Sequence, residues 1–155
     1  MYVFDSSPFS AMFKSFYRGR FPSLWVRFDA LIDSGGIVST REVRRELERY
    51  EEEACVAWLP DHRDVFATPT AEEGRFVADI YRVPHFQQNI EMKKLQKGGL
   101  NADPFVIAKA AVDGLTVVTL ERAPPNSARI PNICQHFAVR CINLEQFMER
   151  EGWKF

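Results

Sequence analysis

Residues 103–119, DPFVIAKAAVDGLTVVT, constrain the fold of this chain more than any other stretch. Asp103 followed by Pro104 predicts a helix start, with Asp103 as the N-cap and proline in the first helical position. The segment FVIAKAAV is apolar nearly all round, which predicts a buried helix. Asp113 and Gly114 predict a turn, and LTVVT predicts a buried strand. A buried helix that leads directly into a buried strand is typical of a parallel sheet covered by helices.

The N-terminal residues show the same alternation of strand and helix. Residues 2–4 predict a short buried strand. Ser7 and Pro8 predict a helix start, with Ser7 as the N-cap. We expect two aromatic-rich helices within residues 9–28, separated by a turn at 18–23.

A second strand and a well-marked helix start follow. Residues 36–38 predict the strand, and Ser39 with Glu42 three positions later forms the pattern of a capping box. Apolar residues at helical spacing then predict a buried stripe, formed by Val43, Leu47, Tyr50 and Ala54.

The middle of the chain has the least clear element boundaries. Residues 60–100 carry turn signals and then one or two amphipathic helices that end near KGG. We expect a last strand at 137–144 and a terminal helix at 145–153. Strands that alternate with helices predict an α/β fold with a mostly parallel sheet, covered on both faces, in a single domain spanning 1–155.

Composition and charge set few limits on function. Apolar residues make up 46% of the chain and the net charge is -1, so global charge neither favours nor excludes a nucleic-acid partner. We find no apolar run near the ~20 residues that cross a bilayer and no signal-peptide pattern. Three cysteines, an odd number without a CxxC pair, suit buried thiols in a reducing compartment. We therefore expect a cytoplasmic protein.

Acidic residues stand at the points where the predicted strands end. Asp5 follows the first strand, and Glu121 lies two residues past LTVVT. Asp103 begins the helix that precedes that strand, and Glu42 and Glu46 lie in the helix after the second strand. Ligands of open parallel sheets gather outside the carboxyl ends of the strands. We therefore expect these carboxylates to meet at one edge of the sheet.

Some of these acids also have a structural explanation. Asp103 is a good N-cap by itself, and Glu42 fits the capping box. Glu46 lies roughly 70° from the centre of the predicted buried stripe, at the edge of the buried face. Buried carboxylates are rare unless they are paired or bind a cation, so Glu46 is favoured over Glu42 for chemistry. Converging carboxylates repel one another unless a hard divalent cation lies among them.

These motifs resemble the PIN-domain family of metal-dependent ribonucleases. The segment VFDSS resembles the first motif of the family, and VRREL resembles the helix motif in which Glu46 precedes a leucine. Residues 103–119 resemble the third motif, in which an Asp opens an Ala-rich helix and a Thr closes the next strand. Glu121 stands where the family has its fourth acid.

The resemblance implies a PIN-like three-layer α/β/α fold with four to five strands and a nuclease active site. Asp5, Glu46, Asp103 and Glu121 would hold one or two Mg²⁺ or Mn²⁺ ions, and Ser7 and Thr119 would orient carboxylates or water. The reaction implied is hydrolysis of RNA, leaving a 5′-phosphate and a 3′-hydroxyl. Many relatives are toxins silenced by an antitoxin, so a cognate antitoxin is also implied; a homodimer stays open.

An acidic site needs basic neighbours to bind RNA. We expect Arg18, Arg20 and Arg122, which lie near the first and fourth motifs, to contact the substrate. Two alternatives remain open: a structure-specific DNA nuclease with the same acids, and a PIN-like module that binds RNA or protein without cutting. A haloacid-dehalogenase-type phosphatase is excluded because it needs a second Asp at position 7, which is serine.

Overall fold

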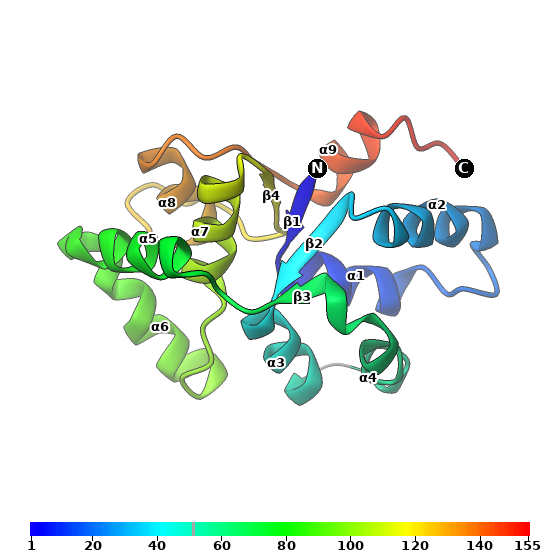
Figure 1. Ribbon diagram of the computed structural model, residues 1–155, viewed down its shortest axis with the longest axis horizontal. Coiled ribbons are helices and arrows are strands. Elements are labelled where there is room, and N and C mark those ends of the chain that lie inside the picture. Colours follow the sequence, from blue (N-terminus) through cyan, green and yellow to red (C-terminus); the bar gives the residue numbers. More distant parts are fainter. Residues whose placement is uncertain (51) are drawn as a thin grey trace.

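The fold is built on a five-stranded sheet in which each neighbouring pair of strands is parallel (Figure 1). The computed structural model describes residues 1–50 and 52–155, and of Tyr50 the backbone only. The strand order is β3-β2-β1-β4-β5. The strands are β1 (Tyr2–Phe4), β2 (Ile37–Thr40), β3 (Phe66–Ala67), β4 (Thr116–Val118) and β5 (Cys141–Ile142).

Helices cover both faces of this sheet, which confirms the predicted three-layer α/β/α architecture. They are α1 (Ser6–Ser15), α2 (Pro22–Asp33), α3 (Arg41–Tyr50), α4 (Glu53–Trp58), α5 (Ala71–Arg82), α6 (Gln88–Lys97), α7 (Asp103–Asp113), α8 (Ile130–His136) and α9 (Leu144–Arg150). Helix α7 lies on one face, and α1 and α2 lie on the other (Figure 1). None of the described helices has both the length and the apolar character needed to cross a bilayer.

Aromatic packing fixes the first strand between the two helical layers. The Phe4 ring lies 5.4 Å from the ring of Phe9 in α1 and 5.1 Å from the ring of Phe147 in α9. These three side chains are fully buried. Val3 is also fully buried and points to the opposite face, where α7 packs. Because β1 is packed from both sides, Asp5 follows it in a well-fixed position.

The first helix begins earlier than predicted, and the N-cap assigned to Ser7 is wrong. Helix α1 starts at Ser6, with Asp5 in the N-cap position and no side-chain capping hydrogen bond. The early start is permitted because Pro8 then falls in the first turn, where its missing N–H leaves no hydrogen bond unmade. Ser7 therefore lies inside the helix, where its hydroxyl donates to Asp5 Oδ2 at 3.2 Å.

The predicted capping box at Ser39 and Glu42 is also wrong. Strand β2 continues through Thr40, so Ser39 is fully buried within the sheet and donates to the Phe4 carbonyl oxygen at 2.6 Å. Thr40 caps the helix instead, since its Oγ1 accepts from the backbone N–H of Val43 at 3.2 Å. Glu42 is free of the capping role, and its carboxylate pairs with Arg41.

The buried stripe of α3 is confirmed in part. Val43 and Leu47 are fully buried, whereas Ala54 is exposed. The helix ends at Tyr50 and α4 begins separately at Glu53, so the helical phase is not carried across. The side chain of Tyr50, also predicted to be buried, lies outside the described part of the structure.

Two short strands differ from the sequence-based expectation. The strand predicted at 137–144 is reduced to β5, because α8 continues to His136 with Phe137 as its C-cap, and Ala138 adopts a positive φ of 55°. Strand β3 was not predicted, since two residues between turn-forming segments carry no alternating pattern. It nevertheless pairs with β2 and extends the sheet on that side.

Candidate metal-binding active site

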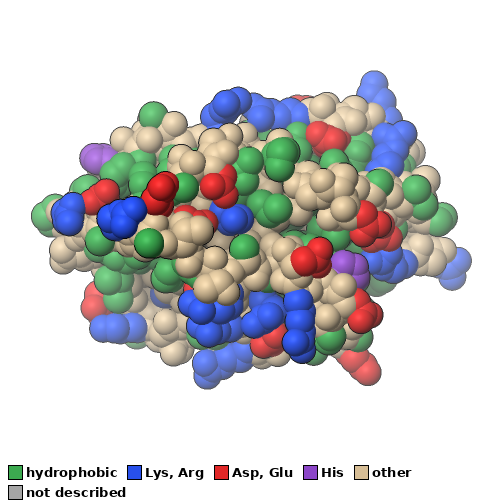
Figure 2. All heavy atoms as spheres, in the orientation of Figure 1, with side chains coloured by type: hydrophobic (Ala, Val, Ile, Leu, Met, Phe, Trp, Pro, Cys, Tyr) green, Lys and Arg blue, Asp and Glu red, His purple; other side chains and the backbone are tan. Residues whose placement is uncertain are grey.

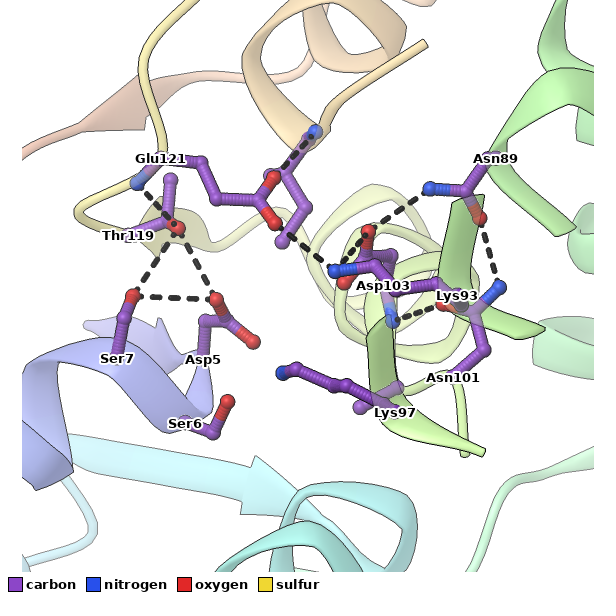
Figure 3. A network of polar contacts seen from close by, with 12 residues as sticks. Asp5, Ser6, Ser7, Asn89, Lys93, Lys97, Asn101, Asp103, Thr119 and Glu121 are labelled. Atoms are coloured by element: carbon purple, nitrogen blue, oxygen red, sulfur yellow. Dashed lines mark hydrogen bonds and ion pairs between the residues drawn. The ribbon is translucent and has the colours of Figure 1, made fainter. Parts of the chain in front are cut away.

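Asp5 lies at the carboxyl end of β1, at the centre of a polar network (Figure 3). Its Oδ2 accepts from the hydroxyls of Thr119 at 3.0 Å and Ser7 at 3.2 Å. Its Oδ1 is buried and has no hydrogen-bond partner. Burial, together with the nearby Glu121 and Glu46 carboxylates, raises the pKa of Asp5 to about 6. Asp5 is thus a carboxylate with one oxygen held and the other unpaired.

Ser7 and Thr119 also hold the segment that follows β4. The Ser7 hydroxyl oxygen accepts from the Leu120 N–H at 2.9 Å, and Thr119 Oγ1 accepts from the Glu121 N–H at 3.2 Å. Helix α1 and the end of β4 are therefore tied together at Asp5. Both hydroxyls thus contact the Asp5 carboxylate, and their role at a metal site stays a prediction.

Asp103 is the first residue of α7 rather than its N-cap, which is Ala102. The predicted capping role is wrong, and the fully buried side chain is available for other contacts. Its Oδ2 accepts from Asn89 Nδ2 at 2.8 Å and lies 3.3 Å from Lys93 Nζ, whereas its Oδ1 is buried without a partner. Burial and then Glu121 raise the pKa of Asp103 to about 7, against the opposing effect of the Lys93 charge.

Glu46 reaches the same site from α3, and its side chain is 2% exposed. Its Oε1 accepts from Ser6 Oγ at 3.2 Å and lies 2.7 Å from Lys97 Nζ. Its Oε2 accepts from the Ala102 N–H at 3.2 Å. Ser6 follows Asp5 and Ala102 precedes Asp103, so Glu46 bridges the immediate neighbours of the two aspartates.

Glu121 closes the site from the segment after β4. Its Oε1 accepts from Lys93 Nζ at 3.1 Å, and its Oε2 accepts from the Ile130 N–H, at the start of α8, at 2.9 Å. Both carboxylate oxygens therefore have partners. The Glu121 charge raises the pKa of both Asp5 and Asp103, so Glu121 lies near each of these aspartates.

Helix α6 supplies the residues that sequence reasoning missed. Asn89, Lys93 and Lys97 stand four positions apart, which places them on one face of the helix, and this face meets the acids (Figure 3). Lys93 is 2% exposed, and burial is outweighed by Asp103 and Glu121, so that its pKa is raised. These three residues could have been found from the sequence by their four-residue spacing, which places polar side chains on one face of a helix that has apolar residues elsewhere.

The acids are arranged around ammonium groups. Within residues 1–50 and 52–155, no three Asp, Glu, His or Cys side chains are grouped as a ready-made metal site. Lys93 lies between Asp103 and Glu121, and Lys97 is paired with Glu46. A cation bound by the acids would thus have two lysines as neighbours.

The predicted substrate-binding arginines lie in different places. Arg18 lies on the loop after α1, where it pairs with Asp29 at 2.8 Å and stacks over the Trp25 ring at 4.0 Å. A ten-residue helix is about 15 Å long, and α1 separates this loop from Asp5. Arg20 is exposed on the same loop, and Arg122 is exposed beside Glu121. Their contacts with RNA stay predictions.

Comparison with known families covers almost the whole chain. The family described as a domain of unknown function, DUF4411, matches residues 2–155. The chain belongs to the DUF4411 family. A comparison with curated proteins gave no match. The DUF4411 match includes the acids, the two hydroxyl residues and the α6 lysines, so the site is built entirely from residues of this family domain.

A groove lies at the start of α7 in the DUF4411 domain. It has a volume of about 430 Å³ and lies between α3, α5 and the residues that precede α7. Its wall includes Tyr81, Pro104 and Phe105, and Arg41 and Arg45 also line it. Figure 2 shows Lys and Arg side chains gathered over α3 and the end of α6. The groove therefore combines two arginines and Glu42 with apolar side chains, and none of the acids Asp5, Glu46, Asp103 and Glu121 is among its lining residues.

Proposed function

We propose that this protein is a metal-dependent endoribonuclease with a PIN-like active site. The observation that carries the proposal is the pair of buried aspartates, Asp5 and Asp103, each with one oxygen that has no partner. Leaving a carboxylate oxygen buried and unpaired is unfavourable unless a cation is bound. These two oxygens come from chain segments almost 100 residues apart in sequence, at the carboxyl edge of a parallel sheet.

The donor set suits a hard divalent cation. Mg²⁺ and Mn²⁺ take oxygen ligands and bind through a few carboxylates while keeping waters. Asp5 and Asp103 would hold the ion, with Glu46 and Glu121 completing the acidic surroundings. A bound ion of this kind polarises a phosphoryl oxygen and lowers the pKa of a water.

The residues of the chain itself would position this site. Ser7 and Thr119 hold Oδ2 of Asp5, so that Oδ1 stays directed away from them. Asn89 donates a hydrogen bond to Oδ2 of Asp103. Its amide also donates to the Ala128 carbonyl oxygen at 3.1 Å, which fixes the position of Asn89. Carboxylates fixed in this way lose little conformational freedom when they bind a ligand.

The adjacent groove supports a nucleic-acid substrate. Arg41 and Arg45 would contact phosphates, and the Tyr81 and Phe105 walls suit the faces of bases. The resemblance of the acid motifs to PIN-domain ribonucleases supports RNA over DNA. The same resemblance supports a role as the toxin of a prokaryotic toxin–antitoxin pair, with a cognate antitoxin as partner.

Cleavage assays test this proposal. The purified chain is incubated with labelled single-stranded RNA, structured RNA and DNA of the same sequence, in Mn²⁺, in Mg²⁺ and in EDTA. We expect divalent-dependent cleavage of RNA within the strand, with 5′-phosphate ends, and loss of at least about 100-fold in rate for Asp5→Asn and Asp103→Asn.

The controls separate the alternatives. Asp33→Asn changes an exposed aspartate far along α2 and should cleave like the wild type. Preferential cleavage of structured DNA would support the DNA-nuclease alternative. Binding of RNA without cleavage in either metal would refute the enzyme and support the non-catalytic module.

A further inference from the structure

Lys93 is the most deeply buried cation of the acidic site. Its side chain is 3% exposed, and its Nζ lies 3.3 Å from Asp103 Oδ2 and 3.1 Å from Glu121 Oε1. Both carboxylates also accept a second hydrogen bond, Asp103 from Asn89 and Glu121 from the Ile130 N–H. The ammonium group is therefore held between two acids that come from different elements of the fold.

We propose that the site takes one divalent cation and that the Lys93 ammonium group replaces a second one. This inference rests on the proposed nuclease function and specifies its metal requirement. In two-metal sites the ions lie about 3.5–4 Å apart and share carboxylate ligands. Here Asp103 would be shared in the same manner, with Oδ2 toward Lys93 and the unpartnered Oδ1 toward the divalent cation.

The charge of the site favours one divalent cation. Asp5, Glu46, Asp103 and Glu121 bring four negative charges when ionised, and Lys93 and Lys97 bring two positive charges. The two negative charges that remain are balanced by a single divalent cation. A second ion would leave an uncompensated positive charge in a buried region, which is strongly unfavourable.

The hydrogen bonds of the Glu121 carboxylate also favour a single divalent cation. One oxygen accepts from Lys93 and the other from the Ile130 N–H, whereas Asp5 and Asp103 each keep one buried oxygen with no partner. Glu121 thus holds Lys93, and the ion is bound on the Asp5 side of Asp103. Glu121 becomes a positioning residue rather than the fourth metal ligand that the sequence pattern predicts.

The two lysines of α6 differ in how firmly they are placed. Lys93 lies in the helix interior, whereas Lys97 is its last residue, has a side chain 29% exposed, and is followed by Gly98 and Gly99 with positive φ. Lys97 is thus the more exposed of the two ammonium groups, and it is paired with Glu46. Lys93 is buried between two carboxylates, so it is the lysine that takes the place of a second ion.

Calorimetric titration with Mn²⁺ tests the stoichiometry, and the electron paramagnetic resonance spectrum of the loaded protein tests it independently. We expect one Mn²⁺ per wild-type chain and a spectrum of isolated ions. Asp103→Asn should weaken Mn²⁺ binding by at least about 10-fold, whereas Glu121→Gln should keep one ion and change affinity less. Two ions per wild-type chain, or an exchange-coupled pair in the spectrum, would overturn the inference.

Substitution of Lys93 gives the sharper comparison. Lys93→Met removes the charge but keeps the length, and should bind a second Mn²⁺; Lys93→Arg keeps the charge and should bind one. Lys94→Met is the matched control, because Lys94 is exposed and pairs only with Glu91 among the described contacts. A folded Lys93→Met variant that still binds one ion would refute the replacement. If the Lys93→Met variant does not fold, the number of Mn²⁺ ions bound per wild-type chain tests the inference by itself.

Failure of this inference differs from failure of the proposed function. A wild-type chain that cleaves RNA with two bound Mn²⁺ ions contradicts only the role of Lys93. A folded wild-type chain that binds no Mn²⁺ at millimolar concentration contradicts the nuclease proposal and this inference with it.

Discussion

The substitution Asp5→Asn should stabilise the metal-free protein at neutral pH while abolishing the proposed nuclease activity. Asp5 is buried near Glu46 and Glu121, and its pKa is about 6 in the folded chain against an ordinary value of 3.8. The folded state therefore holds the proton of Asp5 more tightly than the unfolded state does. Its contribution to stability is fully present below about pH 4 and is lost as the pH rises through 6.

The size of the effect follows from this difference in pKa. One pKa unit corresponds to about 1.4 kcal/mol, so ionised Asp5 lowers the free energy of unfolding at pH 7.5 by about 3 kcal/mol. Asparagine has no charge, and its oxygen can still accept from Ser7 and Thr119. We expect a gain of about 1–3 kcal/mol at pH 7.5, or about 2–4 °C in Tm per kcal/mol, and no gain at pH 4.

Urea unfolding at pH 4 and pH 7.5, with EDTA or with Mg²⁺, measures this effect. With Mg²⁺ the order should reverse, because only the wild type gains free energy from the bound ion. Asp33→Asn, at an exposed position, should match the wild type under all conditions. An Asp5→Asn variant less stable than the wild type at pH 7.5 in EDTA would refute the assignment of Asp5 as a strained buried carboxylate.

Three further substitutions test other parts of the site. Lys97→Met should tighten Mn²⁺ binding in calorimetry, because the ammonium group 2.7 Å from Glu46 no longer competes; weaker binding would contradict this. Asn89→Ala should lower the free energy of unfolding by about 1–3 kcal/mol in urea, since Asp103 loses a buried donor, and an unchanged value would argue against that bond. Arg45→Ala should weaken RNA binding, measured by fluorescence anisotropy with Ca²⁺, and should reduce the slope of the log binding constant against log salt concentration by about 1. Arg18→Ala should change RNA binding less, because the Arg18 guanidinium is held by Asp29.

The elements that carry the acids were predictable because their signals are local and periodic. The apolar strand before Asp5 and the apolar helix after Asp103 both appear in the structure with nearly the expected bounds. The edge of the sheet at which these acids meet then follows from parallel pairing alone. The positions of Asp5 and Asp103 therefore needed no knowledge of tertiary contacts.

The exact helix starts were not predictable in the same way. Ser39 and Thr40 are adjacent and both suit an N-cap by residue type. Ser39 is excluded because its hydroxyl bonds to the Phe4 carbonyl in the neighbouring strand, a contact between residues 35 apart in sequence. Ser7 likewise bonds to Asp5 and to the Leu120 N–H in place of capping a helix. Tertiary partners decide which of two similar polar residues takes a local role.

The α6 lysines explain how the chain can bury its acids without a bound metal ion. Without Lys93, Asp103 and Glu121 would face each other with no cation between them, at a site where burial already raises the pKa of Asp103 to about 7. The helix that carries Lys93 packs against the start of α7 through Asn89 and Asn101, which share a hydrogen bond of 2.7 Å. Helix α6 therefore brings to Asp103 both the amide that donates to it and the ammonium group that pairs with it. An acidic edge that the sequence pattern assigns to metal ions alone is thus a mixed site, in which the chain itself supplies part of the positive charge.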